Sequence, residues 1–214
     1  MIIPLANQLK KKKQVEISAL QDEMVRILYN ISQDSVLHGG TSVWRCYSGK
    51  RFSEDLDFYS KSFPNRIDIF RKEIKAAGLS ILKLKDTSNV IFSHVSDGRT
   101  EVRLEVNHAI KVEGVPVKYE LIDGSHAEVL SLTPNQIILE KIEAYSDRKF
   151  VRDIYDIYYL SSVTEDLSPI KNRLSSFLDN IQRPVDEQIL RSLVYIGIPP
   201  SFERMIGELR RITA

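Results

Sequence analysis

The fold of this chain is decided by residues 38–59, which begin with His38-Gly39-Gly40-Thr41-Ser42 and end with Asp55-Leu56-Asp57-Phe58-Tyr59. Just before this stretch, two apolar residues at 36–37 are typical of the end of a buried strand. After His38 come two glycines and two hydroxyl side chains, then a segment of helical character, and the stretch ends with two carboxylates separated by one apolar residue and followed by two aromatic residues.

The two carboxylates predict a cation site. Alternate side chains of an extended chain share a face, so Asp55 and Asp57 project together while Leu56 enters the core. Two carboxylates held this close repel each other unless a cation lies between them. Mg2+ suits such a site, because it takes its remaining ligands from water and substrate phosphates. The alternative is a solvated strand, on which Asp-x-Asp is common by chance.

The glycine turn supplies a complementary feature. Gly39 and Gly40 let the backbone approach a ligand closely. The amides at the start of the following helix, with the Thr41 and Ser42 hydroxyls, are a candidate anion site. A Gly-Gly turn alone is weak support, but together with the acidic strand it indicates that residues 38–59 hold a triphosphate and its metal ion.

This order of features resembles the signature of the nucleotidyltransferase superfamily, which has the polymerase-beta-like fold. Residues 37–41 and 51–58 are also similar to a narrower branch, the AbiEii/AbiGii-type toxin family of bacterial and archaeal toxin–antitoxin systems. The resemblance implies that Ser53 and Arg51, beside the acidic strand, help to bind the nucleotide.

Composition places few limits on function. The chain has 214 residues, 43% hydrophobic and 28% charged, with a net charge of +1. This balance argues against bulk electrostatic binding of nucleic acid but not against a local basic face. The run Lys10–Lys13 is such a candidate, although a solvated face is the simpler interpretation. One cysteine excludes an internal disulfide, and no apolar run is long enough to span a membrane, so we expect a cytoplasmic protein without membrane association.

The pattern over residues 1–130 predicts an α+β lobe with helices flanking a mixed sheet. Helices are expected over residues 14–30 and from the N-cap Asn65 to Gly78. Strands are expected over residues 80–85, 89–96 and 99–109, with Asp97-Gly98 as a hairpin turn. A further hairpin is expected to join residues 110–112 to 115–119 through Glu113-Gly114.

Glu105 is the candidate for a third carboxylate. Residues 102–107 alternate, so Arg103, Glu105 and Asn107 share one face of a strand. The superfamily resemblance implies an acidic residue on a strand next to the Asp-x-Asp strand. Glu105 is expected to be a metal ligand or the base that activates the acceptor hydroxyl. The alternative is an exposed residue paired with Arg103.

Residues 131–214 predict a helical lobe, entered through the N-cap Thr133 and Pro134. Helical structure is expected through Leu160, and three further helices are expected to start near Ser168, Asp186 and Ser201. Within this lobe, the second signature of the toxin family is matched by Lys141, Ala144, Arg148, Arg152, Asp153 and Asp156.

The second signature indicates a basic clamp with acidic support. Lys141 suits a triphosphate, and the forked guanidinium groups of Arg148 and Arg152 suit phosphates or carboxylates. Asp153 and Asp156, three residues apart on one helical face, are expected to orient these cations or act on the acceptor. The alternative is a salt-bridged helix pair with solvated charges.

The resemblance implies a two-lobed toxin that binds a nucleoside triphosphate (NTP) between its lobes and modifies RNA, with the tRNA 3′ end as acceptor and Mg2+ as cofactor. It also implies a cognate antitoxin as protein partner. Two alternatives remain open from the sequence. One is a nucleotidyltransferase that acts on a small-molecule or protein hydroxyl, and the other is a non-catalytic nucleotide-binding module.

Overall fold

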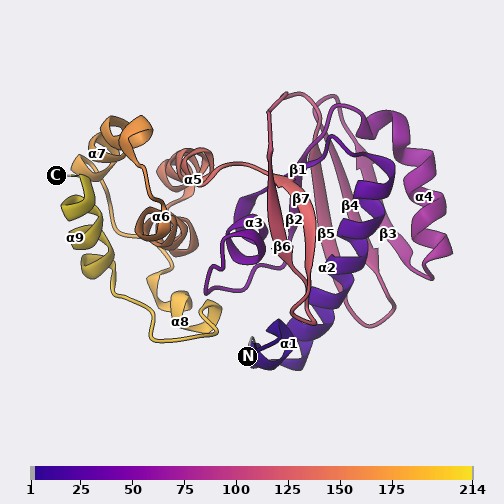
Figure 1. Cartoon of the computed structure of the whole chain (residues 1–214), viewed down its shortest axis with the longest axis horizontal. Helices are drawn as coiled ribbons and strands as arrows, with labels where there is room; N and C mark the ends of the chain where they lie inside the picture. Colours follow the sequence, from indigo (N-terminus) through magenta and orange to yellow (C-terminus); the bar gives the residue numbers. More distant parts are fainter. Residues whose placement is uncertain (1–2, 214) are drawn as a thin grey trace. The chain divides into compact units, whose positions relative to one another are not determined.

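The computed structural model describes residues 3–213, which Figure 1 traces from the N-terminus to the C-terminus. This part of the chain divides into two compact units. The first unit contains the residues up to Cys46 together with Ser53–Leu132, and the second contains Tyr47–Phe52 and the residues from Thr133 onward.

The first unit is an α+β structure, as the sequence predicts. Its helical elements are α1 (Leu5–Gln8), α2 (Lys12–Ile31), α3 (Gly39–Cys46), the 3-10 turn η1 (Phe63–Arg66) and α4 (Ile67–Ala76). Its strands are β1 (Val36–His38), β2 (Leu56–Tyr59), β3 (Ser80–Asp86), β4 (Val90–Ser96), β5 (Glu101–Asn107), β6 (Val115–Glu120) and β7 (His126–Ser131).

The seven strands form one mixed sheet in the order β3-β4-β5-β2-β1-β7-β6. Two pairs, β2 with β5 and β1 with β7, are parallel, and the other neighbours are antiparallel. This confirms the predicted mixed sheet with flanking helices. The parallel pair of β2 and β5 is the important one for function, because it joins the Asp-x-Asp strand to the strand that carries Glu105.

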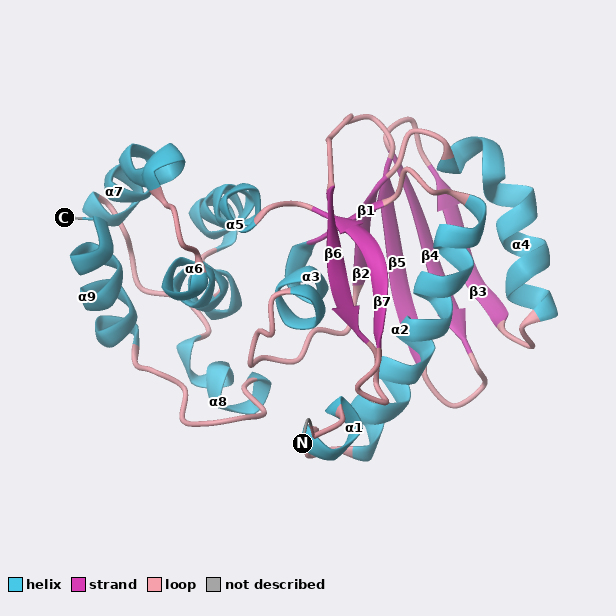
Figure 2. Ribbon diagram, in the orientation of Figure 1, coloured by secondary structure: helices cyan, strands magenta, loops and turns pink. Residues whose placement is uncertain are grey.

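The strands of this sheet have one apolar face and one polar face. Leu37, Leu56, Phe58 and Val106 alternate inward and are fully buried. Helices α2 and α4 pack on the same side of the sheet (Figure 2). The residues between them in sequence point the other way and are less buried, which is the alternation expected for a sheet covered by helices on one side.

The hairpin predicted to turn at Glu113-Gly114 is wrong. Residues 110–112 form no strand, and β6 instead pairs with β7 through a turn that contains Gly124. Gly114 has a different purpose, because a Cβ atom there would lie 2.9 Å from the Val36 methyl groups. The strand over residues 126–131 was not predicted, although Asp123-Gly124 is itself a strong turn signal.

The start of α4 also differs from the prediction. Residues Phe63–Arg66 form a 3-10 turn, and Asn65 lies inside it instead of capping the helix. The other end is as predicted, since α4 stops before Gly78, which adopts a φ of +73°.

The second unit consists of helices. They are α5 (Pro134–Arg148), α6 (Val151–Val163), η2 (Ser168–Ile170), α7 (Lys171–Asp179), η3 (Glu187–Ile189), α8 (Leu190–Leu193) and α9 (Phe202–Thr213). Thr133 and Gln136 form a capping box at the start of α5, where the sequence predicts the N-cap. The predicted helical stretch through Leu160 is interrupted at Lys149, whose φ of +53° ends α5 and lets α6 turn back against it.

Residues 47–52, which the sequence assigns to the first lobe, are attached to the helices of the second unit. Tyr159 Oη donates to the carbonyl oxygens of Tyr47 and Ser48 at 3.0 and 2.7 Å, and Tyr195 Oη donates to Gly49 O at 3.0 Å. The tyrosines that carry these bonds are far from residues 47–52 in the sequence, so no local pattern predicts the attachment.

Among the helices of residues 3–213, none combines the length and apolarity that a membrane span requires.

The packing of α4 yields a first prediction. Phe70 is fully buried with its ring centroid 5.4 Å from that of Phe63, whereas the neighbouring Ile69 is 39% exposed. We expect Phe70→Ala to lower the free energy of unfolding by about 3–5 kcal/mol, because it removes a packed ring and leaves a cavity. Urea denaturation followed by circular dichroism measures this. The matched control Ile69→Ala should change it by less than about 1 kcal/mol, and equal effects would show that α4 is not packed as described.

Candidate active site

The acidic residues of the first unit meet on the polar face of the sheet. In the register of the strands, His38 lies opposite Asp57, and Asp57 lies opposite Glu105. Neighbouring strands are about 4.8 Å apart, so the two carboxylates are direct neighbours. The pKa of Glu105 is raised above its ordinary value, first by burial and then by the charge of Asp57. The sheet therefore brings two of the predicted acidic residues into one electrostatic site.

Asp55 lies at the edge of this site, one residue before β2. Its Oδ2 accepts a hydrogen bond from Arg103 Nη2 at 2.7 Å. Arg103 and Glu105 alternate on the same face of β5, so Asp55 and Asp57 approach the same face, as the sequence predicts. Arg103 was not among the predicted site residues, although its alternation with Glu105 was the available signal.

Gly39 makes the turn after β1 possible. Its φ is +72°, which favours glycine, and a Cβ atom at this position would lie 2.5 Å from Asp57 Oδ2. The sequence suggests that this glycine admits a ligand. The structure shows that it admits the Asp57 carboxylate, which lies against the backbone of the turn.

The predicted hydroxyl contacts to phosphate are not supported by the placement of Thr41 and Ser42. Both side chains are fully buried. Thr41 Oγ1 donates to the carbonyl oxygen of Asp55, and Ser42 Oγ lies 2.6 Å from Ser131 Oγ. These hydroxyls therefore fix α3 to the sheet, and what the turn can offer an anion is the backbone amides of Gly40 and its neighbours at the start of α3.

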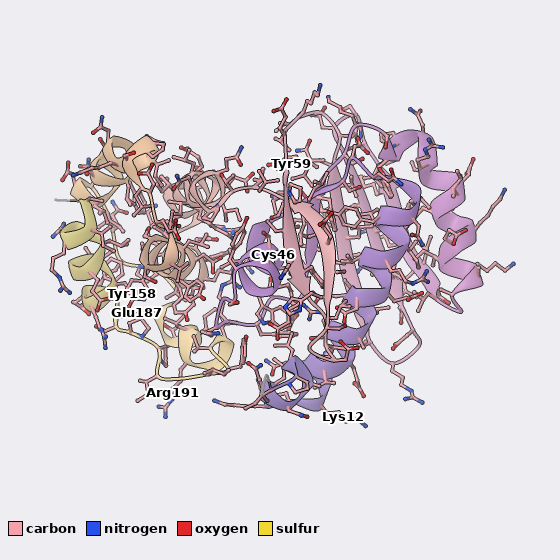
Figure 3. The ribbon with its side chains drawn as sticks, in the orientation of Figure 1. Lys12, Cys46, Tyr59, Tyr158, Glu187 and Arg191 are labelled. Carbon is pink, nitrogen blue, oxygen red and sulfur yellow. The ribbon has the colours of Figure 1, made fainter. Side chains whose placement is uncertain are left out.

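Two further residues border the first-unit site. The imidazole of His38 stacks on the ring of Tyr59, labelled in Figure 3, with the ring centroids 4.0 Å apart. This contact fixes the orientation of His38 next to Asp57. Ser53, a predicted nucleotide-binding residue, lies in the segment before β2, where its carbonyl oxygen accepts from Gln21 Nε2 at 3.1 Å.

The second signature forms a buried cluster within the helical unit. Lys141 Nζ lies 3.2 Å from Asp153 Oδ1 and 3.2 Å from Asp156 Oδ2. Both aspartates are fully buried, and Lys141 is nearly so. Its ammonium group is thus held between two carboxylates on α6 instead of extending freely as a flexible point charge.

Two arginines complete this cluster at either end. Arg51 grips both oxygens of Asp156, with Nε 2.6 Å from Oδ1. Arg148 does the same to Asp153, with both nitrogens at 2.8 Å. The five residues therefore alternate in charge and carry a net charge of +1. Arg51, predicted to neutralise the triphosphate, is buried and has its guanidinium group committed to Asp156.

Arg152 is placed differently from the other cations of the signature. It is half-buried, and its guanidinium carbon lies 5.4 Å from the ring centroid of Phe150. The guanidinium carbon of Arg148 lies at the same distance from that ring. Within the described residues Arg152 forms no ion pair, so its charge remains available to a ligand.

The chain is similar in structure to known nucleotidyltransferases. A protein from H. pylori regarded as a nucleotidyltransferase is 22% identical, with a TM-score of 0.67 over 95% of this chain and 94% of its own. MenT4, a nucleotidyltransferase toxin of Mycobacterium tuberculosis H37Rv, is 18% identical, with a TM-score of 0.60 over 94% and 83%. At these identities the likeness shows the fold, which is that of the nucleotidyltransferases. No curated protein sequence matched.

Residues 26–208 match the family described as nucleotidyl transferase AbiEii toxin, Type IV TA system. Fold and family together define the chain as a nucleotidyltransferase. It belongs to the AbiEii toxin family, as the resemblance predicts. The match spans both the Asp-x-Asp strand and the charged cluster of α5 and α6.

The donor set of the first unit suits a divalent cation in part. Mg2+ needs one or two protein carboxylates besides water and phosphate oxygens, and Asp57 and Glu105 are adjacent carboxylates whose repulsion a cation relieves. Within residues 3–213, however, no three acidic, histidine or cysteine side chains form a ready-made metal centre. Asp55, the third predicted metal ligand, has its Oδ2 atom bound by Arg103.

The contact between Gly39 and Asp57 predicts that one added methyl group at residue 39 strongly lowers the rate of transfer. We expect Gly39→Ala to lower nucleotidyl transfer about 100-fold, because a displacement of the carboxylate by about 1 Å misaligns the reacting groups. Transfer of label from an α-labelled NTP measures this. The control is Gly98→Ala, where φ is +87° and no atom lies within 4 Å of the added Cβ. Equal losses in both variants would mean that backbone strain, and not Asp57, is responsible.

The buried cluster predicts a dependence of stability on pH. Burial alone raises the pKa of Asp153, but hydrogen bonds from Arg148 and the charge of Lys141 outweigh it, so the pKa lies below 3.8. Because the folded pKa is depressed, this stabilisation is present above pH 3.8 and is lost as the pH falls below it. We expect the free energy of unfolding of Asp153→Asn to fall less between pH 5 and 3 than that of the wild type. Parallel curves would contradict the contribution of Asp153.

Proposed function

We propose that this nucleotidyltransferase transfers a nucleotidyl group from an NTP to a hydroxyl of RNA, and that the acceptor is the 3′ end of a tRNA. The observation that carries the proposal is the placement of Asp57 beside Glu105 next to the Gly39 turn, in a chain of the AbiEii toxin family. A toxin that inactivates tRNA stops translation, which suits a growth-inhibiting partner in a toxin–antitoxin system.

The proposed reaction is an in-line displacement. The acceptor oxygen forms a bond to the α-phosphorus, the bond to the oxygen that bridges to the β-phosphorus breaks, and pyrophosphate leaves. Glu105 accepts the proton of the acceptor hydroxyl, a role that its position on the strand beside Asp57 favours. Asp57, with Asp55 once released from Arg103, would hold Mg2+, which neutralises charge on the triphosphate.

Separate groups serve the triphosphate in this proposal. The backbone amides at the start of α3 offer hydrogen bonds to phosphate oxygens, since the first amides of a helix have no partner within it. Within the helical unit, Arg152 keeps a cation that is not committed to an ion pair among the described residues and can meet an anionic ligand. Lys141, Asp153 and Asp156 act as positioning residues, because their charges are already matched within the helical unit.

The remaining parts of the proposal concern the cell. Membership of a toxin–antitoxin family implies an antitoxin, which we propose is the cognate partner encoded with this chain. We place the reaction in the cytoplasm, where both tRNA and nucleoside triphosphates are found.

The test is a transfer assay with each of four α-labelled NTPs, Mg2+ and total tRNA. We expect label in tRNA with one nucleotide. Asp57→Asn and Glu105→Gln should reduce the rate about 10²–10³-fold, in line with the loss of one group that stabilises transferred charge, and chelation of the metal should abolish it. Asp86→Asn, at the exposed end of β3, is the matched control and should leave the rate unchanged.

Three outcomes would contradict parts of this proposal separately. Binding of a triphosphate without label in tRNA for any nucleotide would reject the RNA acceptor and favour a small-molecule or protein hydroxyl. Full activity of Glu105→Gln would remove Glu105 from the reaction. Full activity after chelation would reject Mg2+.

A further inference from the structure

The polar face of the sheet carries a basic and aromatic strip that extends from the acidic residues toward the β3 edge. Residues opposite each other on neighbouring strands share a face of the sheet. The register places Phe92 opposite Glu105 and Lys85 opposite Phe92. In the adjacent row, His94 lies opposite Arg103, and Lys83 lies opposite His94. We call Lys83, Lys85, Phe92, His94 and Arg103 the acceptor strip.

Phe92 is the unexpected member of this strip. Its neighbours Ile91 and Ser93 point into the core and are buried, whereas Phe92 is half-buried on the polar face. The guanidinium carbon of Arg103 lies 5.4 Å from the centroid of this ring. The His94 ring is 6.3 Å from it, centroid to centroid, so two rings lie next to each other on an otherwise charged surface.

Arg103 connects the aromatic pair to the acidic residues. Its guanidinium carbon lies 5.4 Å from the Phe92 ring centroid, and its Nη2 donates to Asp55 at 2.7 Å. Beside it lies a polar pocket of ≈ 450 Å³ that Asp55, His94 and Arg103 line together with Lys13. Lys13 belongs to the basic run that the sequence offers as a candidate RNA contact.

The charge of the strip favours an anion. Lys83 and Lys85 are exposed, and neither forms an ion pair with another described residue. One acidic residue lies next to the strip, since Glu101 Oε1 is 4.0 Å from His94 Nδ1. Two lysines without an ion pair to any described residue and two rings on one surface are the combination that binds single-stranded nucleic acid, in which bases stack on rings and phosphates meet cations.

We propose that the acceptor strip binds the single-stranded 3′ end of the RNA acceptor and directs its terminal hydroxyl to Glu105 and Asp57. This inference rests on the proposed function and names the surface that it requires. Phe92 lies two strands from Asp57, about 10 Å away, so a base close to the 3′ end can reach its ring while the terminal hydroxyl lies at Glu105 and Asp57. This base stacks on Phe92, while Lys83 and Lys85 contact the phosphates that follow.

The experiment measures binding without transfer. The probes are two RNA hairpins, one with a four-nucleotide unpaired 3′ extension and one blunt, bound to the full chain in the absence of NTP and followed by fluorescence anisotropy. We expect Phe92→Leu to weaken binding of the extended hairpin about 5- to 150-fold, the range for loss of one stacked base. Binding of the blunt hairpin should not change, and Phe92→Tyr should bind like the wild type.

The lysines are tested by the dependence of binding on salt. The double variant Lys83→Ala, Lys85→Ala should lower the slope of log affinity against log salt by about 1.4, because each phosphate contact to a single strand contributes about 0.7. Lys75→Ala, exposed on α4 at the opposite face, should leave the slope unchanged.

The outcomes separate this inference from the proposed function. If Phe92→Leu weakens both hairpins equally, or neither, the stacking of an unpaired 3′ end is rejected even when label is transferred to tRNA. If the extended hairpin binds as expected but no NTP labels RNA, the strip stands as an RNA site and the proposed reaction fails. If the wild type does not distinguish the two hairpins, the strip is rejected.

Discussion

The parallel pairing of β2 with β5 places Asp57 beside Glu105, and the repulsion between these two carboxylates governs the surrounding structure. The structure keeps Asp57 and Glu105 close together, and residues on two sides fix the position of the site. Gly39 lets the backbone approach Asp57 to a distance that no side chain would permit, and Arg103 draws the third carboxylate, Asp55, toward itself. A site arranged in this way concentrates carboxylates at one point of the sheet, which is the condition for attracting a cation and, with it, a triphosphate.

The helical unit differs from this, because each charged side chain of its buried cluster is paired with an opposite charge. Arg51, Asp156, Lys141, Asp153 and Arg148 alternate in sign, so each buried carboxylate touches two cations. Removal of one member leaves a buried charge uncompensated, which is far more costly than the pair is stabilising. The signature residues of α5 and α6 therefore have a structural reason to occur together. Arg152, which stacks on Phe150 instead, is the cation whose charge this network does not consume.

The sequence predicts the fold class and the four strands on the β3–β2 side, because alternation and turn residues are local signals. The convergence of Asp57 and Glu105 was expected from the resemblance to the nucleotidyltransferase superfamily, and the register of β2 and β5 shows it. It fails where a residue has two plausible uses. Gly114 and Gly124 both mark turns, but β6 pairs with β7 across Gly124, and Gly114 packs against Val36 instead. Thr41 and Ser42 were predicted to contact phosphate, but their hydroxyl groups form hydrogen bonds with Asp55 O and Ser131 Oγ. Arg51 was predicted to contact the substrate, but it binds Asp156 on α6, which is far away in the sequence. These choices depend on tertiary contacts that no local pattern contains.

The polar face of the sheet extends the same argument from catalysis to recognition. Phe92 lies on this polar face, between Ile91 and Ser93, which point into the core. Part of its apolar ring is therefore open to a ligand. Its position is fixed by the antiparallel register of β4 and β5, which also fixes Glu105. Because one strand pairing sets both residues, the distance between the reacting carboxylate and the proposed stacking platform cannot vary independently. In the proposed reaction, a fixed spacing of this kind would make the sheet itself, more than any loop, the element that sets where the unpaired end of the RNA lies.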